Sequence, residues 1–459
     1  MLNFNLKLLF LYCVILGGWS LFLPYTLGCG VILCSGFVVY KRHNLSIPDL
    51  IFMGAFLLNL WYVTASEGNV RQHDYYNFVM HADYILKNNF FWDKPINYLS
   101  SVFFQPPLWG FFTAFVAKVC MAFGASQANG IDTVRFFSLF CISGCGILFW
   151  RLMGEFKFSL NIKIWTFLYF CFLPINGLAA NWVNNDSVTY FLMMMIIIKG
   201  YQWYLNPEWK KTLCCAGLLA VVGEIKFSGL MVLPVLGIWG LLRLIQAKNK
   251  FSTKLWGQFL IIGLGALLGF GWGFFLLYYH FPLVPPPLDN VIQNMEGYTI
   301  GDRLFSFEHL KIPFIDITNG VLEPNVWLAL LKTSLFGEWA WNGLIWGYLL
   351  YILGLISVLY MLSAAFGLFE YKIDEDGSFN LACLVAVFAV LIPWCKFWMD
   401  YPFFSSTEFR YIMILQPFAL VWMANFADRK SLPKVVKYTL ASGIILMIIA
   451  RFMLYLNTI

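Results

Sequence analysis

The sequence predicts an all-α integral membrane protein, and its composition, its apolar runs and its charge distribution each indicate this class. Of 459 residues, 60% are hydrophobic and only 12% are charged, and the mean hydropathy is +0.72. This balance lies far from that of soluble domains. Crossing a bilayer takes roughly 20 apolar residues per helix, and such runs recur from residue 7 to residue 457. We therefore predict one polytopic domain over residues 1–459.

About 13 membrane spans are expected from these runs. In chain order they cover residues 8–23, 26–40, 48–66, 103–124, 132–152, 187–204, 210–223, 227–247, 256–279, 341–369, 379–398, 409–426 and 434–457. The first run lacks a small-residue cleavage site, so we expect it to stay as an anchor. All 11 cysteines fall in or beside apolar runs, which argues against a disulfide framework or a zinc site.

The basic loops fix the expected orientation, because Lys and Arg gather on the cytoplasmic side of membrane proteins. The loops concerned are 41–43, 210–211, 243–254 and 428–437. Placing them together in the cytoplasm leaves residues 67–102, 280–340 and 400–408 outside. We expect loop 67–102 to be catalytic and loop 280–340 to cap the site.

Residues 163–183 do not fit this assignment of loops to the two sides of the membrane. A simple span here would turn every later basic loop outward, against the charge rule. Pro174 interrupts the run, so we expect a broken re-entrant hairpin that enters the membrane and returns to the outer side. This scheme places Arg151, Lys157 and Lys163 outside.

An amphipathic helix is expected directly after Asp74, in the first outer loop. Apolar residues such as Tyr75 and Phe78 recur at helical spacing, and His81 takes another face. The pattern is typical of a helix lying in the membrane interface. Asp74 is the residue that would precede this helix, so a plain N-capping role is the simpler alternative to catalysis.

Four further polar motifs stand at the predicted outer ends of spans. They are Gln105-Pro106-Pro107, Asn184-Asn185-Asp186, the stretch from Glu224 to Gly229 with Lys226, and Glu408-Phe409-Arg410-Tyr411. Two carboxylates with a lysine and an arginine at one membrane surface suit transfer from a phosphate-linked donor. A carboxylate serves as base, and the cations hold the phosphate that leaves. Taken singly, each residue is more often a boundary charge.

These motifs together resemble the GT-C class of glycosyltransferases. The nearest branch is the superfamily of protein O-mannosyltransferases and lipid A aminoarabinose transferases, and the similarity runs from roughly residue 48 to residue 425. The resemblance implies transfer of a sugar, with inversion, from a polyprenyl-phosphate carrier to an acceptor at the outer face.

The resemblance also implies roles for individual residues. Asp74 matches the first-loop acid and would be the general base, and Asp186 matches the second acid, which positions acceptor or metal. Lys226 and Arg410 would hold the donor phosphate. Side chains expected to contact acceptor or sugar are His73, Tyr75, Gln105, Asn185, Glu408 and Tyr411.

Two departures from the family pattern bear on the chemistry. Gln105 stands where relatives carry His or a Glu-Lys pair, and a neutral amide is a poor ligand for a divalent ion. No cofactor is therefore assigned, and Asp186 is the residue that would hold a metal if the protein uses one. Asp74 is followed by Tyr75 where many relatives have a second acid, so one carboxylate serves as base.

The sequence leaves the sugar and the acceptor open, and the acceptor is a lipid, a glycan or a protein. Loop 280–340 is rich in aromatic residues, which stack well on sugars but also form interfacial belts. A transporter or lipid-carrier flippase is the main alternative, and an inactive scaffold is a second one. No basic stripe for nucleic acid is present. We expect a bacterial cytoplasmic membrane, with the site on its outer side.

Overall fold

The computed structural model of the chain is almost entirely helical. It describes residues 6–20, 45–66, 68, 72, 74–89, 105–247, 252–279, 297–316, 320–367, 373–374, 377–429 and 433–456. An isolated antiparallel bridge joins Asp316 to Val321. The predicted span 26–40 and the candidate site residue His73 lie outside the described residues.

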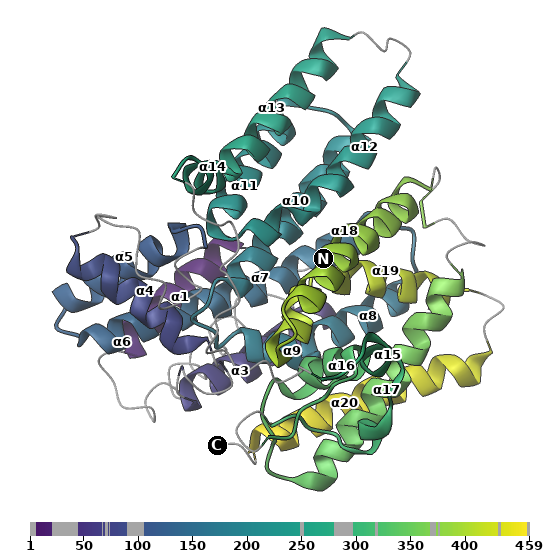
Figure 1. Cartoon of the computed structure of the whole chain (residues 1–459). Helices are drawn as coiled ribbons and strands as arrows, with labels where there is room; N and C mark the ends of the chain where they lie inside the picture. Colours follow the sequence, from purple (N-terminus) through teal and green to yellow (C-terminus); the bar gives the residue numbers. More distant parts are fainter. Residues whose placement is uncertain are drawn as a thin grey trace.

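The helices follow one another through the whole chain (Figure 1). Their bounds are α1 Leu6–Ser20, α3 Ile47–Ala65, α4 Tyr75–Lys87, α5 Leu108–Ala122, α6 Gln127–Asp132, α7 Arg135–Gly154, α8 Leu160–Phe172, α9 Pro174–Ala179, α10 Asp186–Leu205, α11 Trp209–Ile225, η2 Phe227–Val232, α12 Leu233–Gln246, α13 Thr253–Gly269, α14 Gly271–Tyr278, α15 Ile300–Phe305, η3 Glu308–Lys311, α16 Val326–Phe336, α17 Leu344–Phe366, α18 Ser378–Asp400, η5 Phe404–Thr407, η6 Phe409–Tyr411, α19 Leu415–Ala427 and α20 Lys434–Leu456.

Fewer helices than predicted are long and apolar enough to cross a membrane. In the described residues six qualify, or seven if the bent pair α13 and α14 counts as one span. Every predicted span within these residues contains a helix, but several of these helices are shorter or less apolar than a full crossing requires. The described part of the structure therefore does not establish the predicted count of about 13 spans.

The core lies around α7 and α10, whose side chains are mostly buried. Helices α1, α3 and α8 pack against α7, and α11 and α12 pack against α10. In Figure 1, α12 and α13 extend from this core as an arm. Helix α11 closely approaches α13 of this arm, because Gly223 and Gly265 face backbone atoms of the opposite helix.

The predicted span 103–124 does not cross the bundle. Its helix, α5, has 15 residues and is about 22 Å long, short of the roughly 30 Å that a crossing needs. Trp109 near its start lies beside Phe137, with ring centres 6.0 Å apart, and Ala117 near its end faces Gly130. Both ends therefore lie along the first part of the α6–α7 segment. The apolar run was misleading because α5 packs with α4 and α6 at this end of the bundle.

The turn between α7 and α8 lies at the opposite end, which we call the basic end. Ser159 donates to Asp428 at 2.6 Å, and Gln202 donates to Glu155 at 2.8 Å. The basic end thus holds the 155–159 turn, the end of α10 and Asp428, which begins the loop predicted to be cytoplasmic.

The structure therefore places Arg151, Lys157 and Lys163 at the same end of the bundle as Asp428, whereas the prediction put them on opposite sides of the membrane. These residues belong to the α7–α8 turn region, which Asp428 contacts. The error has a simple cause: counting α5 as a crossing reversed the direction of α7. When α5 is not counted as a crossing, all of these basic residues fall at the basic end, as the charge rule expects.

The expected break at Pro174 is present, but the hairpin is not. Pro174 begins α9 after a break at Leu173. Helix α8 starts at the basic end, whereas Asn181, after α9, accepts from Arg135 at 3.0 Å at the other end. The segment therefore crosses the bundle once, as two helices.

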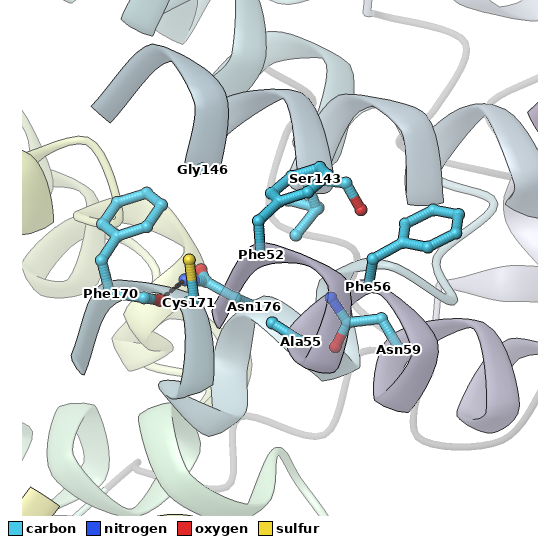
Figure 2. A pocket seen from close by; sticks show the side chains of 10 residues that line it. Phe52, Ala55, Phe56, Asn59, Ser143, Gly146, Phe170, Cys171 and Asn176 are labelled. Carbon is cyan, nitrogen blue, oxygen red and sulfur yellow. Dashed lines mark hydrogen bonds between the residues drawn. The ribbon is translucent and has the colours of Figure 1, made fainter. Parts of the chain in front are cut away.

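A buried arginine occupies the break. Arg451 of α20 donates to the carbonyls of Cys171 and Leu173 at 3.5 and 3.3 Å and to Asn59 at 2.8 Å. The carbonyl of Leu173 also accepts from the backbone N–H of Asn176 at 3.0 Å, so Arg451 adds a further donor at the break, where Pro174 has no N–H. Figure 2 shows the adjoining pocket, whose lining includes Asn59, Ser143, Cys171 and Asn176. Its cavity of about 10 Å³ has room for about one water molecule.

The described part of loop 280–340 is more regular than its sequence suggested. It contains α15, η3 and α16, and every residue of α16 except Trp327 is buried. Asn325 caps α16 by accepting from the backbone of Trp327 and Leu328, both at 3.0 Å. Lys332 of α16 forms a buried ion pair with Glu323, which fixes the preceding loop against the helix.

Candidate active site

Asp74 does not act as a simple helix cap. It stands at the N-cap position of α4, but its side chain makes no capping hydrogen bond. Instead Oδ2 accepts from Nη1 of Arg410 at 2.6 Å, across 336 residues of sequence. Arg410 is 7% exposed and Asp74 is 24% exposed. The pair therefore lies at the edge of the bundle, with the carboxylate facing inward.

Asp186 joins the same cluster from the start of α10. Its Oδ1 pairs with Nζ of Lys226, and its Oδ2 lies 3.4 Å from Nη1 of Arg410. Lys226 sits at the junction of α11 and η2, where the helix ends and the backbone turns. One carboxylate thus holds both cations together.

Glu408 and Tyr411 complete the surroundings of Arg410. The carboxylate of Glu408 is buried and lies 2.6 Å from Nε of Arg410. The ring of Tyr411 lies 5.2 Å from the guanidinium carbon and 5.6 Å from Nζ of Lys226. Burial alone would lower the pKa of Arg410, but the carboxylates of Asp74, Glu408 and Asp186 raise it well above its usual value.

Sequence reasoning missed a contact made by the residue before this arginine. The hydroxyl of Thr333, on α16, accepts from the backbone N–H of Phe409 at 2.9 Å. The bond connects the large loop region to the residue beside Arg410. The sequence carries no signal for it, because the two residues lie 76 positions apart.

Gln105 and Asn185 bond to each other rather than to a carboxylate. Nδ2 of Asn185 donates to Oε1 of Gln105 at 2.7 Å and to the carbonyl of Ile225 at 3.0 Å. Among the described residues no group of three His, Cys, Asp or Glu side chains is arranged to hold a metal. Because Asp186 already faces two cations, its donor set fits a divalent ion poorly.

The loop from Asn181 to Asp186 is held by side chains from several elements. Gln72 accepts from the backbone of Val183, and Trp109 donates to its carbonyl, both at 2.8 Å. Ser138 donates to the carbonyl of Trp182 at 2.5 Å. Residues from the first loop, α5 and α7 thus set where Asp186 stands.

Two predicted residues do not join the cluster. The hydroxyl of Tyr75 donates to Asp132 at 3.3 Å, so this side chain faces α6. Glu224, from the same motif as Lys226, accepts from the backbone of Trp272 at 3.1 Å and thereby caps α14.

A small cavity adjoins the charges and is apolar on its other side. It measures about 30 Å³ and is lined by Asp186, Thr189, Tyr190, Met193, Lys226, Ser228, Met231, Arg410, Tyr411, Met413 and Ile414. Charged side chains thus border methionines and an isoleucine in one space. Such a surface suits a molecule that is anionic at one end and apolar at the other.

Comparison with known proteins supports the fold. No family model and no curated protein matches the chain. The chain is similar to the crystal structure of ArnT from Cupriavidus metallidurans bound to undecaprenyl phosphate, with a TM-score of 0.52 and 10% identity, covering 92% of this chain and 76% of ArnT. Against the apo state of ArnT the TM-score is 0.36 at 14% identity, over 92% and 78% of the two chains. The protein therefore has the fold of ArnT, a GT-C lipid A aminoarabinose transferase, as the resemblance of its motifs predicted.

Proposed function

We propose that this protein is a membrane glycosyltransferase that uses a polyprenyl-phosphate sugar as donor. It transfers the sugar, with inversion, to an acceptor that is a lipid, a glycan or a protein. The observation that carries the proposal is the cluster in which Arg410 touches both Asp74 and Asp186 while Asp186 also holds Lys226.

The two cations suit the donor phosphate. Lys226 and Arg410 share Asp186, and they lie 5.6 and 5.2 Å from the ring centre of Tyr411. A phosphate arriving here would compete with the carboxylates for the same N–H groups, and Arg favours such oxyanions through paired hydrogen bonds. The apolar part of the cavity, with Met193 and Met231, would receive the first isoprene units. The similar ArnT structure was determined with undecaprenyl phosphate, which supports this class of donor.

The pairing of Arg410 with Asp74 suggests how donor binding prepares the base. While Arg410 neutralises Asp74, the carboxylate is a weak proton acceptor. When Arg410 turns to the donor phosphate, Asp74 is released to bind the acceptor hydroxyl. Catalysis is then coupled to occupation of the donor site.

The transfer itself is a single displacement. Asp74 takes the proton of the acceptor hydroxyl, and the oxygen forms a bond to the anomeric carbon. The bond from that carbon to the phosphate oxygen breaks, and its electron pair leaves with the phosphate. Lys226 and Arg410 offset the charge that develops there. Attack opposite the leaving group inverts the anomeric centre.

The charge distribution supports an outer site. Arg151, Lys157, Lys163 and the 428–437 loop share the basic end, which the charge rule directs to the cytoplasm. Asp74 and Arg410 lie at the other end. We propose a bacterial cytoplasmic membrane, with transfer at its outer face.

Transfer measured with a radiolabelled undecaprenyl-phosphate sugar tests the function directly. Membranes containing the wild type are compared with Asp74→Asn, and the acceptor is identified from the lipid-linked glycan that accumulates when the protein is deleted. Loss of a general base lowers the rate by about 10²–10⁴-fold. Asp83→Asn is the control, because Asp83 lies on the same helix and pairs with Lys87.

Two results would contradict the proposal. Transfer by Asp74→Asn at the wild-type rate would exclude this residue as base. Movement of the labelled lipid across the membrane without any transfer would favour a flippase instead.

A further inference from the structure

Arg303 is a buried cation outside the charge cluster. It lies on α15, is 3% exposed, and stacks its guanidinium carbon 4.5 Å from the ring of Trp398. Its Nη1 donates to the carbonyl of Trp398 at 2.8 Å. Its Nε and Nη2 are buried and make no hydrogen bond with any residue that the structure describes.

No carboxylate among the described residues pairs with this guanidinium. The adjacent Asp302 is exposed, and its carboxylate accepts from the backbone and hydroxyl of Thr299 at 2.9 and 2.7 Å. Burial lowers the pKa of Arg303 to about 10, so the group stays charged at neutral pH. A buried charge with two unused donors is costly, and an anion would satisfy both.

The two free donors have the geometry for a phosphate. Nε and Nη2 share one edge of the guanidinium plane, and their N–H bonds point in parallel. Paired N–H groups of this kind bind two oxygens of a phosphate at once.

The surface around Arg303 is apolar. Five large side chains in segment 298–310 are exposed, and Phe305 is 74% exposed. They are Tyr298, Ile300, Phe305, Phe307 and Leu310. Aromatic side chains gather at membrane interfaces, and an arginine among them reaches toward the lipid headgroups.

We propose that segment 298–310 docks on the bilayer surface and that Arg303 binds the phosphate of an anionic phospholipid through Nε and Nη2. The exposed apolar side chains then lie among the acyl chains. The site adjoins the charge cluster but is separate from it. Phe397 contacts Tyr411 at 5.2 Å, whereas its neighbour Trp398 contacts Arg303, and successive helical residues point about 100° apart. The proposal does not depend on transferase activity.

Hydrogen–deuterium exchange of the full chain in nanodiscs tests the site. Backbone exchange in residues 297–312 is compared between phosphatidylcholine alone and phosphatidylcholine with phosphatidylglycerol. We expect phosphatidylglycerol to slow exchange in the wild type and to have no such effect in Arg303→Met. Arg303→Lys keeps part of the effect, because lysine retains the charge without the paired donors. Phosphatidylglycerol retained in native mass spectra should bind about tenfold more weakly to Arg303→Met.

Arg151→Met is the matched control, since it removes an exposed arginine at the basic end and should leave the slowing intact. Equal exchange in the two lipid mixtures would overturn the proposal. Slowing by inorganic phosphate in phosphatidylcholine alone would show a free-anion site instead. Slowing by undecaprenyl phosphate but not by phosphatidylglycerol would assign Arg303 to the substrate. If Arg303→Met does not fold, the wild-type lipid comparison and Arg303→Lys decide the question.

Discussion

Arg410 donates to Asp74 at 2.6 Å although the two residues are 336 positions apart. The contact joins the residue before α4 to the segment before α19. It also places the proposed phosphate ligand on the proposed base, so that one side chain connects donor binding to proton transfer.

Replacing Arg410 should damage both stability and activity. Arg410→Gln leaves the carboxylates of Asp74, Asp186 and Glu408 without their shared cation. Removing one partner of a buried ion pair costs about 3–5 kcal/mol, which thermal unfolding in detergent would show. The double variant Arg410→Gln with Glu408→Gln should recover part of this loss, because Glu408 is the most buried of the three partners. Equal stability of the wild type and Arg410→Gln would disprove the structural importance of the pairings.

Lys226 should affect donor affinity more than the rate of transfer. Lys226→Met removes one of the two cations near the cavity, so we expect the KM for a polyprenyl-phosphate sugar to rise about tenfold or more. Lys226→Arg should retain much of the affinity. Steady-state kinetics with varied donor measure the effect, and Lys396→Met is the control, since Lys396 is an exposed lysine on α18. A change confined to the acceptor KM would argue against phosphate binding by Lys226.

The sequence predicted most of the cluster but not its connections. Asp74, Asp186, Lys226 and Arg410 were recognisable because charges at the ends of apolar runs are rare. The pairing of each carboxylate with a cation depends on packing between distant segments. This packing cannot be predicted from a single sequence. Arg303, Thr333 and Arg451 were missed for the same reason, because each binds backbone groups far away in the chain.

The fold prediction failed where an apolar helix does not cross the bundle. An apolar helix that packs at one end of the bundle, such as α5, has the same kind of composition as one that crosses. Counting it reversed α7, and the re-entrant hairpin at Pro174 was then needed to restore the later topology. Both errors share one origin.

Chelation should leave transfer unchanged. Asn185 donates to Gln105, and Asp186 is already paired with Lys226 and Arg410. We expect treatment with EDTA, followed by dialysis, to change the rate less than about twofold, which is well below the effect of losing a catalytic group. A large loss that Mg²⁺, Mn²⁺ or Zn²⁺ restores would show that a metal takes part.

Acid should destabilise the protein through His81. Burial within α4 lowers the pKa of His81 to about 4 from the ordinary 6.5 of a histidine side chain. The folded state therefore binds fewer protons than the unfolded state between these values, and stability falls as the pH drops from 6.5 toward 4. At pH 5 the loss is about 2 kcal/mol.

The change in melting temperature between pH 7 and pH 5 measures this effect. His81→Gln should reduce the change, because glutamine does not titrate. His309→Gln, in a different part of the structure, should leave it as in the wild type. An unaltered pH dependence in His81→Gln would show that other groups are responsible.

The close packing of α11 against α13 should tolerate no side chain at Gly223. A Cβ at this position would overlap the backbone carbonyl of Gly269, whereas a Cβ at Gly217, on the same helix, meets nothing within 4 Å. Alanine is normally favoured over glycine in a helix by about 0.5–1 kcal/mol. Gly217→Ala should therefore be neutral or stabilising, and Gly223→Ala should lose about 1–3 kcal/mol through overpacking. Because Lys226 follows directly at the end of α11, the displaced helix should also shift this cation relative to Asp186. Thermal unfolding and donor KM of the two alanine variants test both consequences, and equal behaviour of the pair would mean that the helices separate without cost.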